Sequence, residues 1–123
     1  EVNLGGTYLI CKYANKAKYI INIGSTDGIN TYSPISLDYS ASKAGIINLT
    51  KNLSLHYKDK KIYCVCPNWI NTESVKLMNP EYLMSEMKRI GQKELLDKDK
   101  VATEIYKLIE SNKKSGSVVI INE

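Results

Sequence analysis

The sequence predicts an α/β fold in which about three parallel strands pack between helices. Three short apolar runs, rich in β-branched residues, have the length and boundaries of buried strands: residues 18–24, 61–66 and 117–121. Patterns typical of helices separate these runs. Strands that are joined by helices pair in parallel through right-handed crossovers, so this order of elements predicts a parallel sheet.

The first helix is expected over residues 1–17, where Leu4, Tyr8 and Cys11 recur on one face. The pair Gly5-Gly6 weakens this helix by about 1 kcal/mol per glycine relative to alanine. Such a cost is tolerable if another helix or a cofactor must approach closely there. The chain begins inside the helix without a capping residue, so its start looks like a cut rather than a natural beginning.

Three more helices are expected further along the chain. They cover residues 39–58, residues 79–91, and a segment that ends near residue 112 and is capped by Asp97 or Asp99. Loops are expected over 25–38 and 67–78. The helix over 79–91 carries methionines among charged residues, so it is either an ordinary packing helix or a lid over a site.

Composition and charge exclude several classes of function. The chain of 123 residues has room for one small domain, residues 1–123. The net charge of +4 comes from dispersed lysines without a long basic run, so no nucleic-acid partner is expected. No apolar stretch reaches the roughly 18 residues that a membrane span needs, and no signal peptide opens the chain. We therefore expect no membrane association and a cytoplasmic location.

The cysteines are expected to be reduced and buried. Cys64 and Cys66 alternate within the strand over 61–66, so both side chains face the same side of the sheet. A metal site would need more ligands than the single histidine, His56, can add. No metal is expected for this reason.

Tyr39 and Lys43 carry the strongest sign of chemistry in the chain. They are four residues apart, so in a helix they lie on the same face, one turn apart. A free tyrosine keeps its proton to about pH 10, and a nearby ammonium group would lower that pKa toward neutrality. The pair follows a strand that ends in Gly24-Ser25-Thr26-Asp27-Gly28. In open parallel sheets, ligands bind at the carboxyl ends of strands.

These segments resemble the short-chain dehydrogenase/reductase family, whose signature is a serine after a strand followed by Tyr-x-x-x-Lys. The resemblance covers nearly the whole chain, but only the second half of the family's Rossmann-like, doubly wound sheet. It implies that Tyr39 is the general acid or base, that Ser25 donates to the substrate oxygen and that Lys43 lowers the Tyr39 pKa. Asn3 matches a fourth catalytic residue, which holds a water that links Lys43 to solvent. The implied reaction is NAD(P)(H)-dependent reduction of a carbonyl, such as that of a 3-oxoacyl thioester, or oxidation of the alcohol.

The resemblance also implies which residues contact the cofactor. Residues 67–72 match the family's Pro-Gly-x-x-x-Thr loop. The residues expected to bind NAD or NADP are therefore Tyr39, Lys43, Pro67, Ile70 and Thr72. The family's first βα unit, with its glycine-rich phosphate loop, is absent, so we expect the chain alone to be inactive. Residues 24–30 imitate that phosphate loop but enter a proline-containing loop rather than a helix, which rules them out.

Two departures from the family pattern bear on the site. Ser25 and Tyr39 are fourteen positions apart where thirteen is usual, which leaves Thr26 as an alternative hydroxyl. Asn68 stands where the family has glycine, and asparagine tolerates a positive φ better than most residues.

Two other functions compete with the oxidoreductase. Ser40 and Lys43 match the Ser-x-x-Lys motif of penicillin-interacting enzymes, but the accompanying Ser-x-Asn or Tyr-x-Asn is missing from residues 44–113. Alternatively, the chain is a truncated, non-catalytic fragment or an interaction module that keeps the fold. The resemblance further implies a small-molecule carbonyl or alcohol substrate, and a homo-oligomer (dimer or tetramer) that packs through the helices over 1–17 and 39–58.

Overall fold

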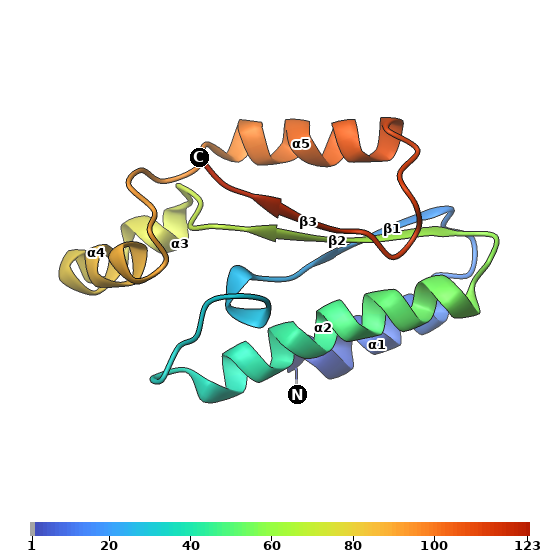
Figure 1. The fold of residues 1–123 in the computed structure, drawn as a ribbon, viewed down its shortest axis with the longest axis horizontal. Coiled ribbons are helices and arrows are strands. Elements are labelled where there is room, and N and C mark those ends of the chain that lie inside the picture. The colour runs from blue at the N-terminus through green and yellow to red at the C-terminus, as the bar shows by residue number, and fades with distance from the viewer. Residues whose placement is uncertain (1) are drawn as a thin grey trace.

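The computed structural model describes residues 2–123. In chain order the elements are α1 (Val2–Tyr13), β1 (Tyr19–Ile23), the 3-10 turn η1 (Thr26–Gly28), α2 (Leu37–His56), β2 (Lys61–Pro67), α3 (Glu73–Lys76), α4 (Pro80–Arg89), α5 (Lys98–Glu110) and β3 (Val118–Ile121). The strands pair in parallel in the order β1-β2-β3 (Figure 1). The predicted α/β class and the three-stranded parallel sheet are confirmed.

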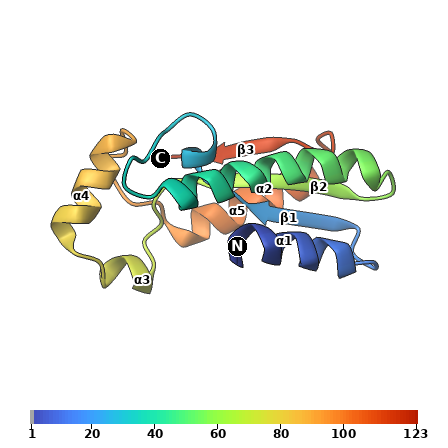
Figure 2. The ribbon, with the colours of Figure 1, turned by 90° about the horizontal axis from the view of Figure 1, so that it is seen from below.

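Helices cover both faces of the sheet. α5 lies on one face, and α1 and α2 lie together on the other (Figures 1 and 2). Successive side chains of a strand point to opposite faces, so β2 supplies both layers of the core. Tyr63 and Val65 pack with α5, whereas Ile62, Cys64 and Cys66 pack with the helices of the other face. Both cysteines of β2 are buried on the same side of the sheet, as predicted.

A buried polar network fastens β1 to the helices beneath it. Asn22 Nδ2 donates to Thr50 Oγ1 at 3.0 Å, and Thr50 Oγ1 donates to the carbonyl of Ile46 at 2.8 Å. On the other side of the amide, Cys11 Sγ donates to Asn22 Oδ1 at 3.5 Å. A buried amide that keeps its partners is tolerated, whereas one that loses them is costly. The network therefore fixes the position of β1 relative to α1 and α2.

The boundaries of the elements differ from the predicted ones by a few residues. α1 ends at Tyr13 and α2 begins at Leu37, four and two residues earlier than expected. The predicted loop over 67–78 contains the short helix α3. Of the two candidate caps of α5, Asp97 is the cap, because its carboxylate accepts from the amide of Asp99.

Apolar side chains of α1 and β1 remain exposed. Among the side chains of α1 whose burial the structure describes, only Cys11 belongs to the core, although Leu4 and Tyr8 were expected to share its face. The exposed side chains are those of Leu4, Tyr8, Leu9, Ile10, Tyr13, Tyr19 and Ile23. β1 is also an edge strand of the described sheet. Exposed apolar side chains gathered on neighbouring elements are typical of a surface that contacts another protein segment.

None of the helices in residues 2–123 combines the length and the apolar character that crossing a membrane requires.

Glycine at position 28 is required by the close approach of η1 to α2. A Cβ atom there would lie 2.7 Å from the amide nitrogen of Ala44 and 2.8 Å from the carbonyl carbon of Lys43. Both are backbone atoms, which cannot rotate away. By contrast, a Cβ atom at Gly5 or Gly6 would meet no atom of the described residues within 4 Å. The close approach that would explain this glycine pair is therefore not made within the described part of the chain.

We predict that Gly28→Ala destabilises the chain by about 1–3 kcal/mol, because the added methyl group overlaps the backbone of α2. The matched control is Gly5→Ala, which should stabilise the chain by about 0.5–1 kcal/mol because it replaces a helix-interior glycine in open space. Urea unfolding of the two variants measures both free energies. A Gly28→Ala variant as stable as the wild-type chain would contradict the close packing of η1 on α2.

Candidate active site

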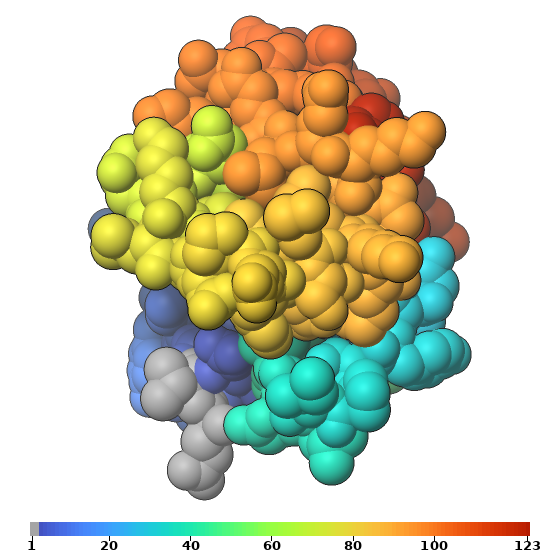
Figure 3. Space-filling view, turned by 90° about the vertical axis from the view of Figure 1, so that its left-hand side faces the viewer, coloured from blue at the N-terminus to red at the C-terminus, as the bar shows by residue number. Residues whose placement is uncertain are grey.

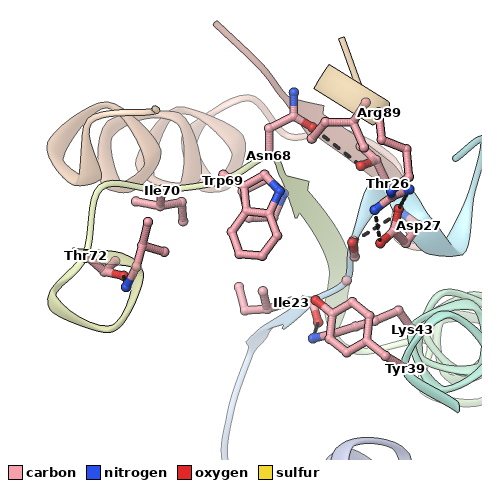
Figure 4. Close-up of a pocket in the computed structure, with 15 residues that line it drawn as sticks. Ile23, Thr26, Asp27, Tyr39, Lys43, Asn68, Trp69, Ile70, Thr72 and Arg89 are labelled. Atoms are coloured by element: carbon pink, nitrogen blue, oxygen red, sulfur yellow. Dashed lines mark hydrogen bonds and ion pairs between the residues drawn. The ribbon is translucent and has the colours of Figure 1, made fainter. Parts of the chain in front are cut away.

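A cavity of about 250 Å³ lies at the carboxyl ends of β1 and β2. Its walls come from residues 23–27 after β1, from the first turns of α2, and from residues 67–72 after β2 (Figure 4). Helices α3 and α4 complete it with Val75, Arg89 and Ile90. In the space-filling view of this end of the molecule, the segment over α3 and α4 lies across the middle, between α5 and the loop that leads into α2 (Figure 3).

Tyr39 and Lys43 both line this cavity from one face of α2. Lys43 Nζ lies over the Tyr39 ring, 5.7 Å from its centre, as the spacing of one helical turn predicts. The same ammonium group donates to the carbonyl of Ile23 at 3.1 Å. An ammonium has three protons, so this contact leaves it able to donate to a ligand as well.

Ser25 is held with its hydroxyl proton available. Its Oγ accepts from the amide of Asp27 at 3.2 Å, which caps η1. A hydroxyl that accepts through its oxygen can still donate its own proton. The alternative hydroxyl, that of Thr26, is buried, and its Oγ1 donates to Asn68 Oδ1 at 3.4 Å. The geometry therefore favours Ser25 over Thr26 as the donor beside Tyr39.

The pKa of Tyr39 is raised above its ordinary value, which corrects the expectation that Lys43 lowers it. Burial of the phenol is the largest cause of the raised pKa, a hydrogen bond with Ser25 opposes it, and the charge of Asp27 adds to it. The Lys43 ammonium lies over the ring and donates to the carbonyl of Ile23. The phenol therefore keeps its proton at neutral pH and is a proton donor in this structure.

The backbone of Ile70 is turned away from the neighbouring segment. Ile70 forms a parallel bridge with Leu96, in which Asn71 N donates to Leu96 O at 2.8 Å and Leu96 N donates to Trp69 O at 2.9 Å. In such a bridge the flanking residues make the hydrogen bonds, and the amide and carbonyl of the central residue point to the opposite side. Ile70 thus has the backbone orientation that a ligand contact requires.

The other predicted residues of this loop also line the cavity. Pro67 is the last residue of β2. Thr72 Oγ1 accepts from the amide of Val75 at 3.4 Å, so it caps α3 and still has a proton to donate. Asn68 is not among the residues with positive φ in the described chain, so its place in the turn does not depend on the left-handed region.

Asn3 lies apart from these residues. Its side chain is exposed on α1, its carbonyl accepts from Thr7 Oγ1 at 2.6 Å, and it does not line the cavity. The structure therefore brings together six of the seven predicted site residues: Ser25, Tyr39, Lys43, Pro67, Ile70 and Thr72. The proposed role of Asn3, through a bound water, stays a prediction.

Several residues of the site were missed by the sequence analysis. Trp69 projects into the cavity (Figure 4), and Gln92 fixes its backbone by accepting from Trp69 N at 2.9 Å and donating to Trp69 O at 2.8 Å. Asp27 and Arg89 form an ion pair at the edge of the cavity. A lone tryptophan after a strand was a usable signal, whereas Arg89 looks like any charged residue of an amphipathic helix.

Comparisons with known proteins agree with this arrangement. A sequence model of the short chain dehydrogenase family matches residues 1–83. The 3-oxoacyl-[acyl-carrier-protein] reductase of Bos taurus is 33% identical over 130 residues, which cover 99% of this chain and 53% of the bovine protein.

Solved structures show the same fold. A 4-hydroxyisoleucine dehydrogenase complexed with NADH and succinate superposes with a TM-score of 0.80 and 25% identity, over 98% of this chain and 54% of the other. The structure of ElxO with NADP bound superposes with a TM-score of 0.78 and 30% identity, over 97% of this chain and 53% of the other. The chain thus spans about half the length of the relatives that it matches. The family model, the identity to the bovine reductase and the fold all agree. The chain therefore belongs to the short-chain dehydrogenase family.

Proposed function

We propose that residues 1–123 form one partial Rossmann-like domain, the catalytic half of an NAD(P)(H)-dependent oxidoreductase that reduces a carbonyl or oxidises the corresponding alcohol. The observation that carries this proposal is the convergence of Ser25, Tyr39 and Lys43 on a single cavity at the carboxyl end of β1. A protonated phenol beside a donating hydroxyl is the arrangement that carbonyl reduction needs.

Each of the three side chains has a separate task in this proposal. Ser25 donates to the substrate oxygen, where negative charge develops during reduction. Tyr39 then supplies the proton to that oxygen as general acid. Lys43 lies beside them and donates to the cofactor. Tyr39 holds its proton at neutral pH, as a general acid must before it transfers that proton.

The residues at the mouth of the cavity fit a nicotinamide group. A bound nicotinamide supplies the hydride, or accepts it in the reverse reaction. The backbone of Ile70 and the hydroxyl of Thr72 are the donors and acceptors proposed for its carboxamide, and Pro67 would flank the ring. Residues 24–30 are not proposed to bind its phosphates, since they form η1 and a loop, and the next α-helix begins only at Leu37.

The identity of the substrate is narrowed by the relatives and by the cavity wall. The bovine relative is named as a 3-oxoacyl-[acyl-carrier-protein] reductase. In this chain the lining of the cavity includes the apolar side chains of Trp69, Val75 and Ile90. We therefore propose a substrate with an apolar group next to its carbonyl, such as a 3-oxoacyl thioester. The choice between NAD and NADP, the cytoplasmic location and the homo-oligomeric assembly stay predictions.

We predict that Tyr39→Phe lowers the carbonyl-dependent oxidation of NADPH or NADH by about 10²- to 10⁴-fold, the usual contribution of a general acid. The assay uses the full-length protein that contains this chain, with a 3-oxoacyl thioester and simple ketones as substrates. Tyr32→Phe is the matched control, because Tyr32 is 79% exposed and does not line the cavity.

Equal rates for Tyr39→Phe and the wild-type protein would reject the enzymatic role and favour the alternative, a non-catalytic module that keeps the fold. The 123-residue polypeptide, assayed alone, should oxidise neither NADPH nor NADH measurably, because it lacks the phosphate-binding loop of the family.

A second prediction concerns the phenol itself, without any cofactor. We expect Tyr39 to titrate above its ordinary pKa of about 10, because its phenol is partly buried. Ser25→Ala should raise that pKa further, since it removes the hydrogen bond that opposes the shift. Ser36→Ala is the control, because the Ser36 side chain makes no capping hydrogen bond. Carbon-13 NMR of labelled tyrosine follows the titration, with Tyr39→Phe to assign the signal; a Tyr39 pKa below 10 would contradict the described burial.

A further inference from the structure

Arg89, at the end of α4, is held by groups from three parts of the chain. Its Nη1 donates to Asp27 Oδ1 at 2.9 Å and its Nη2 donates to Asp27 Oδ2 at 3.1 Å, which makes a two-pronged pair with η1 (Figure 4). Its Nε donates to Glu86 Oε2 at 2.8 Å, within α4. Nη1 also donates to the carbonyl of Tyr32 at 2.9 Å. One guanidinium group thus joins α4 to the loop that connects β1 with α2.

This ion pair differs from the others in the described chain. Side-chain exposure is 21% for Arg89, 11% for Asp27 and 10% for Glu86. The pairs Lys76–Glu73 and Lys107–Glu104 are more exposed and each lies within one helix. Exposed pairs contribute little to stability, whereas a partly buried, two-pronged pair fixes the geometry of the groups that it joins. Among the ion pairs of residues 2–123, only Arg89–Asp27 connects segments that are distant in the sequence.

The charges of Arg89 and Asp27 each favour the charged form of the other group. Burial alone would raise the pKa of Asp27, but hydrogen bonds from Arg89 and Thr31 and the charge of Arg89 outweigh it, so the pKa is lowered. Glu86 and Asp27 in turn raise the pKa of Arg89. Asp27 and Arg89 are therefore both charged at neutral pH. Of the cations that line the cavity, Arg89 is neutralised by carboxylates, and Lys43 is the one that a substrate or cofactor can use.

Asp27 connects Arg89 to Ser25. Its carboxylate is held by Arg89 and by Thr31 Oγ1, while its own amide donates to Ser25 Oγ at 3.2 Å. A shift of the Asp27 backbone would therefore change the direction in which the Ser25 hydroxyl donates. On its other side the turn rests on α2 through Gly28, so Arg89 is the contact that holds it from the side of α4.

We propose that Arg89 is a positioning residue: by binding Asp27 it docks α4 on the loop after β1 and holds the Ser25 hydroxyl toward Tyr39. The predicted effect on catalysis rests on the proposed function, whereas the docking of α4 on the loop after β1 does not. Misplacing a group by about 1 Å can cost 10²-fold in rate, so loss of the contact should act on the chemical step. The substrate would still meet the apolar wall of the cavity and bind.

The test compares Arg89→Gln, Arg89→Lys and Asp27→Asn in the full-length protein. Arg89→Gln should lower kcat by roughly 10- to 100-fold with little change in KM, the pattern of an interaction that matters in the transition state. Arg89→Lys keeps the charge but cannot make the two-pronged contact, so it should restore only part of kcat. The double variant of Asp27→Asn with Arg89→Gln should be no worse than the more severe single variant, because both remove one contact. The control is Lys88→Gln, whose side chain is exposed next to Arg89.

Amide hydrogen exchange separates this inference from the proposed function. Arg89→Gln should speed exchange both in residues 80–90 and in residues 25–31, whereas Lys88→Gln should change neither. Faster exchange in 80–90 alone, with kcat unchanged, would overturn the proposal, and so would a change confined to KM. If Tyr39→Phe matches the wild type but Arg89→Gln still exposes residues 25–31, the enzymatic role fails while the docking contact stands. Asp27→Asn, nearly equal in shape to the wild type, gives the same readout should Arg89→Gln fail to fold.

Discussion

The parallel pairing of β1 with β2 is the constraint on which the site depends. Ile23 lies opposite Val65, and the ladder continues beyond β1 because the amide of Gly24 donates to Val65 O at 2.7 Å. Parallel strands end at the same edge of a sheet, so the segments that follow them must face each other. Ser25 then stands across from the loop over 67–72, and the space between them is the cavity. Every other contact at the site refines this arrangement.

Burial of the Tyr39 phenol has more influence on its pKa than the nearness of Lys43. Lys43 lies one turn from Tyr39, and the spacing alone predicts a lowered phenol pKa. The ammonium instead lies over the ring and donates to the Ile23 carbonyl, and partial burial of the phenol raises its pKa. A charge shifts a pKa effectively only when it reaches the ionising atom in a poorly solvated setting. The phenol is consequently a proton donor until another group reorganises this corner of the cavity.

Patterns in the sequence predicted those features of the fold and the site that depend on residues close together in the chain. The three strands, the helices and the placing of Ser25, Tyr39 and Lys43 at one edge follow from periodicity, from the order of elements and from the family motif. The contact of Arg89 with Asp27 did not follow, because the two residues are 62 positions apart and nothing near either one marks the other. The need for glycine at position 28 could not be predicted either. Gly28 is required by a helix backbone far along the chain, which its neighbours in sequence do not reveal.

Ile23 is where the site meets the exposed surface of the chain. Its carbonyl accepts from Lys43 and its side chain lines the cavity, yet it is 47% exposed at the outer edge of the sheet. A protein segment that packed on the outer edge of β1 would contact this residue and bound the cavity from that side. Such a segment would also remove water from Lys43 and Tyr39, which strengthens the electrostatic interaction between the ammonium group and the phenol. The geometry of the proposed catalytic side chains is thus set within residues 2–123, whereas their electrostatics would change with any segment that covered β1.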